Sequence, residues 1–399
     1  MPVDAAQFRQ QLQRITSRIS QAREWREQSL VVLRQALLDP PPDRQVWAER
    51  CRRFVAQYPE WGGAAFADEE SLDQQFPFGA EPQSYALIAA DGSQVLPDRH
   101  KTAVYAVIQA ACACMTYGVP DRQAAERALA AGRDRKMELI AEDELRRDDG
   151  ELVGAGEIGA RRDFLEIRLL AQRCSEFRDA GLQPIGVADG SLVPFSLLAA
   201  TRPSALRQAL DDLKASLDRL RACGAIAAGY IDRPGHTALS RACALAHLLR
   251  RDSQTETTPR EVEQLSHGIL DGQLLEEDVL PAGFRTALFD PGWQVNRELG
   301  AHAIRSCYLN AGEPGQPIIA RLDLPGWSAG PQQVGALAGV LRRHTRMGGG
   351  YPLALKAAHE QAVITLQDQA EIENAIDLEL MSLGYRPSRS RKQEAKDHR

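Results

Sequence analysis

The sequence predicts an α/β protein built on a mixed sheet flanked by helices, with a helical extension at its N-terminus. Apolar residues recur at helical spacing over residues 4–38, and short apolar runs typical of buried strands begin at residue 85. Further along the chain, helical and strand-like segments alternate. Antiparallel strands followed by such an alternation favour a mixed sheet with helices packed against it.

The N-terminal region is predicted to be helical. Residues 4–38 carry an apolar stripe that includes Phe8, Leu12, Ile15 and Ile19, and three prolines at 40–42 are expected to end this helix. The stripe is expected to cover its own domain or to take part in dimer or partner contacts.

A second helix is predicted over 44–57, followed by a connector rich in Gly, Pro and acidic residues at 59–82. We therefore expect a helical region with its connector at 1–80, a main domain at 81–385, and a basic tail at 386–399 that is disordered.

The main domain is expected to begin with a strand, a turn and an antiparallel meander. Its later segments are expected to alternate between helix and strand. The predicted strands are 85–90, 101–117, 135–140, 184–188, 225–231, 285–289, 301–309 and 317–322, and the predicted helices are 157–177, 203–223 and 237–250, with further helices at the C-terminus.

The composition is that of an ordinary globular protein. Among the 399 residues, 44% are hydrophobic and 26% are charged, and the net charge of −6 does not indicate a general nucleic-acid binder. Basic residues nevertheless gather at 341–346 and 386–392. These residues are expected either to contact phosphates or to form an ordinary solvated surface. The seven cysteines include no Cys-x-x-Cys pair, so we expect reduced core residues. We find no apolar run that predicts a membrane span and expect a cytoplasmic protein.

A repeated phrase is the most informative feature of the chain. Asp91-Gly92-Ser93 and Asp189-Gly190-Ser191 each follow a short apolar run. A single Asp-Gly-Ser is usually only a turn. Two copies, each expected where a strand leaves the sheet, offer two carboxylates that repel each other unless a divalent cation lies between them, and such oxygen-rich sites suit Mg²⁺ or Mn²⁺.

Glu166 is the candidate for a third acidic ligand. It lies on the helix predicted before Asp189, and Leu169 and Leu170 follow it on the same face. A carboxylate on a half-apolar face needs a partner. The alternative is an exposed glutamate that pairs with Arg162 or Arg173.

The segment 348–359 adds a tyrosine and a histidine. Pro352 is expected at the start of a helix, so that Tyr351, Leu355 and His359 share one stripe. Eight residues at 1.5 Å each separate Tyr351 and His359 by about 12 Å along the axis, so both cannot flank one metal equally. His359 is the better candidate for a ligand.

These residues resemble the NurA nucleases of archaea and some bacteria. The resemblance lies in Asp91-Gly92-Ser93, a helical glutamate, Asp189-Gly190-Ser191 and a terminal Tyr-Pro-x-x-Leu-x-x-x-His at 351–359, and it spans about 85–376. It implies an RNase H-like core in a nuclease domain at 81–385. It also implies Mn²⁺-dependent (or Mg²⁺-dependent) 5′–3′ exonuclease and single-strand endonuclease activity on DNA, a homodimer, and partnership with the HerA-like hexameric ATPase in DNA end resection and double-strand break repair.

By this resemblance, Asp91, Glu166 and Asp189 are the acidic metal ligands, His359 completes or neighbours the site, and Tyr351 orients the substrate or a water. The glutamate lies in a poorly defined pattern, which leaves Glu157, Asp163 and Glu176 as alternatives to Glu166.

Three further residues are weaker candidates. Ser93 and Ser191 are expected to cap their turns or to bond the carboxylates rather than act as nucleophiles. Arg233 is expected to contact phosphate or to belong to a structural loop. Two competing functions stay open, a non-catalytic adaptor for DNA or the translocase and a phosphoesterase acting on RNA or small esters.

Overall fold

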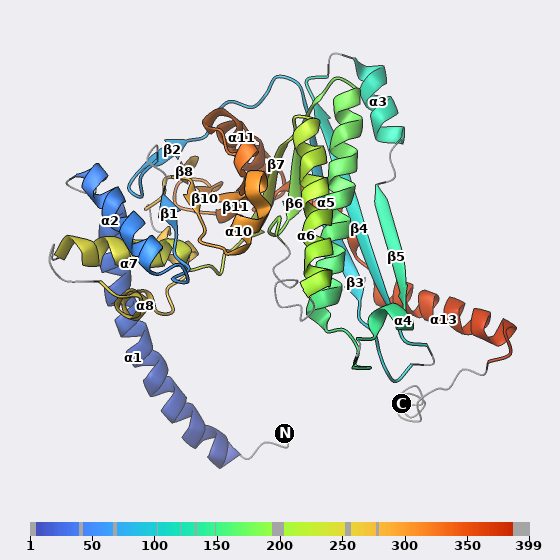
Figure 1. Cartoon of the computed structure of the whole chain (residues 1–399), viewed down its shortest axis with the longest axis horizontal. Helices are drawn as coiled ribbons and strands as arrows, with labels where there is room; N and C mark the ends of the chain where they lie inside the picture. Colours follow the sequence, from blue (N-terminus) through green and yellow to red (C-terminus); the bar gives the residue numbers. More distant parts are fainter. Residues whose placement is uncertain are drawn as a thin grey trace. The chain divides into compact units, whose positions relative to one another are not determined.

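The computed structural model describes residues 5–39, 43–66, 70–101, 103–119, 121–131, 134–147, 149–193, 203–251, 257–276 and 279–385. They form two compact units (Figure 1). The first consists of Met1–Phe78 with Asp232–Leu322, and the second of Gly79–Ile231 with Asp323–Arg399. The prolines at 40–42 and the tail at 386–399 lie outside the described residues. The division of the chain at residues 80 and 385 stays a prediction.

The first unit contains the two N-terminal helices, which form where the apolar spacing predicts them. The C-terminal end of α1 buries Leu33 and Leu37 in a core shared with α7, and Phe54 of α2 lies in the same core. The helices of this unit are α1 (Ala5–Leu38), α2 (Arg44–Gln57), α7 (Ala238–Arg251), α8 (Pro259–Ser266), α9 (Asp271–Leu274), α10 (Val295–Leu299) and the 3-10 turn η2 (Gly300–His302).

Short antiparallel strands complete the first unit. Residues 59–82, expected to be only a connector, contain β1 (Ala65–Phe66) and β2 (Gln75–Pro77). They pair with β9 and β8 respectively, more than 200 residues later, and no local pattern announces such distant partners. The remaining strands are β8 (Phe284–Thr286), β9 (Phe289–Asp290), β10 (Ile304–Asn310) and β11 (Ile319–Pro325), the last of which continues into the second unit.

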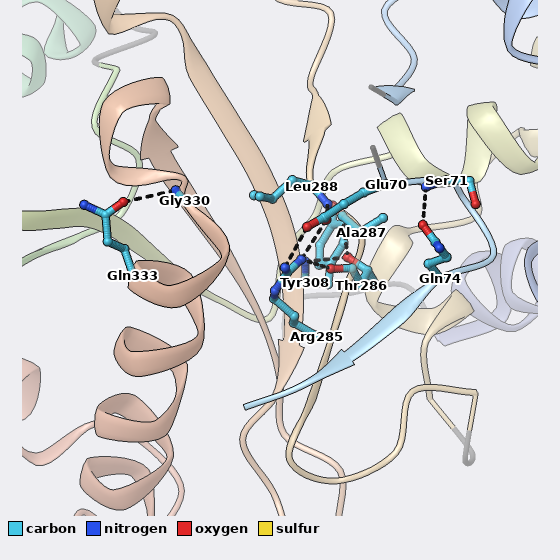
Figure 2. A network of polar contacts seen from close by, with 10 residues as sticks. All are labelled: Glu70, Ser71, Gln74, Arg285, Thr286, Ala287, Leu288, Tyr308, Gly330 and Gln333. Atoms are coloured by element: carbon cyan, nitrogen blue, oxygen red, sulfur yellow. Dashed lines mark hydrogen bonds and ion pairs between the residues drawn. The ribbon is translucent and has the colours of Figure 1, made fainter. Parts of the chain in front are cut away.

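A buried ion pair fixes the loop that joins β1 to β2. Figure 2 shows the Arg285 guanidinium donating to both oxygens of Glu70, at 2.8 and 2.9 Å, while the amide of Leu288 donates to the same carboxylate at 2.7 Å. Burial by itself would raise the pKa of Glu70, but the hydrogen bonds from Arg285 and Leu288 outweigh it and lower the pKa below its usual value. The pair is therefore ionised and stabilising near neutral pH.

The second unit contains a mixed sheet with the strand order β7-β6-β3-β4-β5. Strands β3, β4 and β5 are antiparallel neighbours, whereas β3, β6 and β7 are parallel. This confirms the predicted mixed sheet. The strands are β3 (Tyr85–Val95), β4 (Tyr105–Tyr117), β5 (Arg135–Ala141), β6 (Gln183–Asp189) and β7 (Ile226–Asp232).

Helices pack against this sheet, as expected. α5 and α6 lie side by side along it (Figure 1), and α5 contacts β3, β4 and β6. α12 packs against β3 and β4. The helices are α3 (Arg122–Ala131), α4 (Glu142–Leu145), α5 (Ala155–Asp179), α6 (Pro203–Ala222), α11 (Pro331–Met347), α12 (Leu353–Ala362), α13 (Leu366–Ser382) and the 3-10 turn η3 (Gly326–Ser328).

Within the described part of the chain, every helix is too short or too polar to cross a bilayer.

The substitution Glu70→Gln is expected to destabilise the protein by about 3 kcal/mol, because it leaves the buried Arg285 charge without its carboxylate. Since the folded-state pKa of Glu70 is lowered, its contribution is present at neutral pH and is lost as the pH falls through that value. Denaturant unfolding between pH 7 and pH 3 should therefore show the difference between wild type and variant shrinking in acid.

Glu27→Gln is the matched control, because the Arg23–Glu27 pair is solvent-exposed and should contribute no more than about 0.5 kcal/mol. Equal unfolding free energies for Glu70→Gln and Glu27→Gln at pH 7 would contradict the role given to the buried pair.

Candidate functional site

Asp91 lies inside a strand rather than at its end, so the first Asp-Gly-Ser is not a turn. The reason is β4, which pairs with β3 residue by residue from Tyr85 to Val95 and places Asp91 opposite Ala111. Gly92 has a packing role instead, because a Cβ there would meet the Arg162 side chain at 2.7 Å. The expectation that both aspartates lie at strand ends is therefore wrong for Asp91.

Asp189 is the last residue of β6, as the sequence predicts. The parallel pairing of β3 and β6 ends at Ala90 and Ala188, so Asp91 and Asp189 occupy the next position of their strands. Neighbouring strands lie about 4.8 Å apart, and residues at equivalent positions share a face. We call this side of β3 and β6 the aspartate face.

His359 and Tyr351 each bond one of the two aspartates. His359 of α12 lies with its Nδ1 atom 2.7 Å from Oδ2 of Asp91, whose Oδ1 accepts from the amide of Gly92 at 2.7 Å. The Tyr351 hydroxyl donates to the Asp189 carboxylate, and its ring packs edge-on against Tyr230 with centroids 5.8 Å apart.

Tyr351 precedes α12 rather than lying on it. The helix begins at Leu353 after Pro352, so Tyr351 and His359 do not share the predicted helical stripe. Gly349 and Gly350 have φ of 71° and 114°, a conformation that turns the chain before the helix. Burial, followed by the nearby Asp189 carboxylate, raises the pKa of Tyr351 well above its usual value. The phenol therefore stays protonated and acts as a donor.

Glu166 is buried rather than exposed, with 3% of its surface accessible. Burial raises its pKa well above the ordinary range, and the carboxylates of Asp163, Asp91 and Asp189 add to this effect while Arg162 opposes it. The simple surface ion pair with Arg162 or Arg173 is therefore excluded as the environment of this glutamate.

Glu166 approaches from the other side of the sheet. Arg162, one helical turn earlier on α5, lies against Gly92, and residues 91 and 92 face opposite sides of β3. The α5 carboxylate thus lies near the two aspartates without sharing the aspartate face.

Of the three alternatives to Glu166, two are engaged elsewhere. Glu157 pairs with Arg147 at 2.7 Å, and Glu176 pairs with the buried Arg173. Asp163 forms an ion pair with Arg162. Its pKa is raised overall, because the effects of burial and of the Asp91 carboxylate outweigh the lowering by Arg162. Asp163 therefore stays an alternative to Glu166.

The two serines bond different partners. The Ser93 hydroxyl accepts from the amide of Ile364 at 3.0 Å, a contact that ties β3 to the chain after α12 and does not cap a turn. The Ser191 hydroxyl accepts from Val193 at 3.2 Å and donates to Oδ2 of Asp323 at 2.8 Å.

Asp323 is a site neighbour that sequence reasoning missed. It lies on β11 with no exposed surface, and its Oδ2 accepts from the hydroxyl of Ser191, two residues after Asp189. The available signal was the charged pair Arg321 and Asp323 inside an otherwise apolar run, since a charge within a buried strand requires a partner.

The turn after Asp189 depends on two glycines. Gly190 has φ of 111°, and its amide donates to the carbonyl of Tyr230 at 2.8 Å. The turn then passes so close to β7 that a Cβ at Gly229 would lie 2.3 Å from the Gly190 carbonyl oxygen. Glycine at 229 therefore permits the position of Asp189 and Ser191.

Arg233 belongs to the first unit, so the structure does not assign it to this site. Its side chain is 94% exposed and lies 3.9 Å from Asp232, and its φ is 44°. The phosphate contact expected of it stays a prediction.

The donor set fits a divalent cation in its chemistry. Carboxylate oxygens are the ligands that Mg²⁺ and Mn²⁺ prefer. A cation would favour the ionised forms of Glu166 and Asp163, whose pKa values are raised by burial and by neighbouring carboxylates. Among the residues that the structure describes, however, no group of three or more His, Cys, Asp or Glu is arranged around one point.

Comparison with known proteins gives one family. The model of the NurA domain matches residues 85–364, well over half of the chain and a range that includes both aspartates and His359. The crystal structure of the NurA nuclease from Sulfolobus solfataricus is similar with a TM-score of 0.46 and 11% identity, over 85% of this chain and 96% of that one. No curated protein matches the sequence.

Glu166→Gln is expected to stabilise the metal-free protein. A carboxyl whose folded-state pKa is raised favours folding less as the pH rises above the ordinary glutamate value, because ionisation is then easier in the unfolded chain. At pH 8 in EDTA, the variant should melt about 2 °C or more above wild type, the shift that 1 kcal/mol produces in a domain of this size. At pH 4 the difference should vanish.

Glu157→Gln serves as the control, because Glu157 is stabilised by Arg147 and its loss should not raise the melting temperature. Equal melting temperatures for wild type and Glu166→Gln at both pH values would contradict the conclusion that ionised Glu166 destabilises the metal-free protein.

Gly229→Ala is expected to destabilise the protein by about 1–3 kcal/mol, because the added Cβ has to displace backbone atoms of residues 190–192. Thermal unfolding measures this loss. Gly235→Ala is the matched control, since a Cβ there meets nothing within 4 Å. Equal stability of the two variants would show that the turn tolerates displacement.

Proposed function

The chain belongs to the NurA family, and from this we propose that it is a metal-dependent DNA nuclease that hydrolyses phosphodiester bonds. The observation that carries the proposal is the pairing of Asp91 with His359 and of Asp189 with Tyr351 at neighbouring positions of β3 and β6. Each carboxylate is oriented by its own partner, so the two do not have to share a proton with each other. Their remaining oxygen lone pairs stay available to a cation. The strand order β5-β4-β3-β6-β7 supports an RNase H-like core.

In the proposed mechanism, Asp91 and Asp189 would hold the cation, and Glu166 or Asp163 would supply a further carboxylate from the α5 side. A bound Mn²⁺ or Mg²⁺ supplies charge neutralisation at the phosphate and lowers the pKa of an attacking water. His359 fixes the orientation of the Asp91 carboxylate, and the protonated Tyr351 does the same for Asp189. Because its pKa is raised, Tyr351 donates a hydrogen bond and does not act as a base.

The raised pKa of Glu166 links its ionisation to cation binding. Its raised pKa favours the neutral carboxyl in the metal-free protein, so that metal binding and proton release are coupled. This coupling makes cation affinity rise with pH.

The finer assignments rest on family membership. We propose 5′–3′ exonuclease and single-strand endonuclease activity on single-stranded DNA and on the ends of double-stranded DNA, in end resection and double-strand break repair. The proposed assembly is a cytoplasmic homodimer working with a HerA-type hexameric ATPase. The sequence contains no G-x-x-x-x-G-K-[ST] loop, which is consistent with ATP hydrolysis by the partner.

A non-catalytic adaptor is the second candidate function. It is favoured by one observation, the lack of a closed cluster of three ligands among the described residues. An adaptor of this fold would bind DNA or the translocase without cation-dependent turnover, whereas a phosphoesterase for RNA or small esters would turn over other substrates.

Asp91→Ala and Asp189→Ala are each expected to reduce cleavage of a 5′-labelled single-stranded oligonucleotide by about a thousandfold, since each removes a carboxylate that positions the cation. Initial rates in EDTA, Mg²⁺ and Mn²⁺ measure the effect. Asp179→Ala, an exposed aspartate at the end of α5, is the control and should cleave like wild type.

Cleavage that persists in either aspartate variant would remove that residue from the site. Wild-type protein without any cation-dependent cleavage of DNA, alone or with its translocase, would favour the adaptor. Cleavage assays on RNA and small phosphate esters distinguish the phosphoesterase alternative from a DNA nuclease.

A further inference from the structure

The N-terminal half of α1 carries an apolar stripe that its own unit does not cover. Phe8, Leu12, Ile15 and Ile19 are 48–59% exposed, whereas Leu33, further along the same helix, is fully buried. We call these four exposed residues the α1 seam. Their separations of four, three and four residues are those of the a and d positions of a coiled coil.

The seam is narrow. At 100° per residue, its four side chains fall within an arc of about 60°. A helix that covers a globular core or lies on a membrane needs an apolar face about 100° wide or more, while a strict a/d stripe suits a single partner helix. The shape of the stripe therefore favours a two-stranded coiled coil.

Arginines border the seam on both sides. On a helical wheel, Arg9 and Arg23 lie on one flank and Arg18 on the other, and residues 5–23 contain no acidic side chain. Of these arginines, Arg23 pairs with Glu27 one turn later. The opposite side of the helix carries Arg14 and the uncharged polar residues Gln10, Gln13, Ser17, Ser20 and Gln21. Flanking positions of this kind select the partner of a coiled coil by charge.

The charges argue against a second copy of α1. Pairing this segment with itself, parallel or antiparallel, brings arginine against arginine at the flanking positions, and like charges there destabilise the pair. The phosphates of a nucleic acid would pair with the arginines, but they would leave the apolar side chains of the seam exposed to water. A helix with its own apolar seam and glutamates or aspartates on its flanks satisfies both features.

We propose that the N-terminal half of α1 is a docking surface for an acidic amphipathic helix of a partner protein, bound as a two-stranded coiled coil. The apolar residues supply the buried contact, and the flanking arginines supply the selectivity. This surface is independent of the aspartate face, and the proposal does not rest on nuclease activity.

The test uses the full chain and a fluorescein-labelled peptide of four heptads with leucine at a and d and glutamate at e and g. A second peptide of the same length has lysine at e and g. Fluorescence anisotropy at low salt should show binding of the glutamate peptide that is about tenfold or more tighter than that of the lysine peptide, because several flanking ion pairs add. The preference should shrink in 1 M NaCl.

Three double variants of the exposed surface sharpen the test. Leu12→Asp combined with Ile15→Asp should abolish binding of the glutamate peptide, whereas Gln13→Asp combined with Ser17→Asp, on the opposite side of α1, should retain it. All four positions are exposed, so circular dichroism and the melting temperature should stay at wild-type values. Arg9→Glu with Arg18→Glu should reverse the preference between the two peptides.

The proposal is overturned if neither peptide binds, if both bind equally, or if the Leu12 and Ile15 variant binds like wild type. It is also overturned if sedimentation shows a dimer of this chain that the same variant dissolves, which would make a second copy the occupant. Tighter binding of single-stranded DNA or phosphatidylserine vesicles to the seam than of the glutamate peptide would likewise exclude it.

Discussion

The parallel register of β3 and β6 is the constraint on which the candidate site depends. It sets Asp91 beside Asp189, which places two carboxylates one strand spacing apart in a buried sheet. Such an arrangement is costly unless each charge finds a donor or a cation. Tyr351 and His359 supply partners from the C-terminal segment, so residues separated by 162 positions (Asp189 and Tyr351) and 268 positions (Asp91 and His359) meet at one face of the sheet.

Close backbone approach makes this register possible. Gly92 leaves room for Arg162 of α5, and Gly229 lets the turn after Asp189 cross β7. The buried carboxyl groups of Glu166 and Asp163 then lie near the two aspartates from the α5 side, and their pKa values are raised by burial and by neighbouring carboxylates. The concentration of raised carboxyl pKa values in one region is typical of a functional site, because a fold selected only for stability would neutralise or expose these groups.

The first unit contains both a buried, paired charge and an exposed apolar stripe. Glu70 and Arg285 are buried together and satisfy each other, which holds a loop against strands that follow it by more than 200 residues. In contrast, the N-terminal half of α1 leaves an apolar stripe and several arginines in solvent. The buried pair is complete within the chain, whereas the stripe is the kind of surface that a partner completes.

The sequence by itself determined the helices and most strands, because apolar periodicity is a local property. It also singled out Asp91, Asp189, Tyr351 and His359, since the repeated Asp-Gly-Ser and the terminal motif can be read without a fold. Only the tertiary structure decided that Asp91 lies within a strand, because that depends on β4 pairing through Gly92 and Ser93. Which tyrosine or histidine bonds which aspartate, the burial of Glu166 and the place of Asp323 depend on contacts between distant segments, and local pattern carries no information about them.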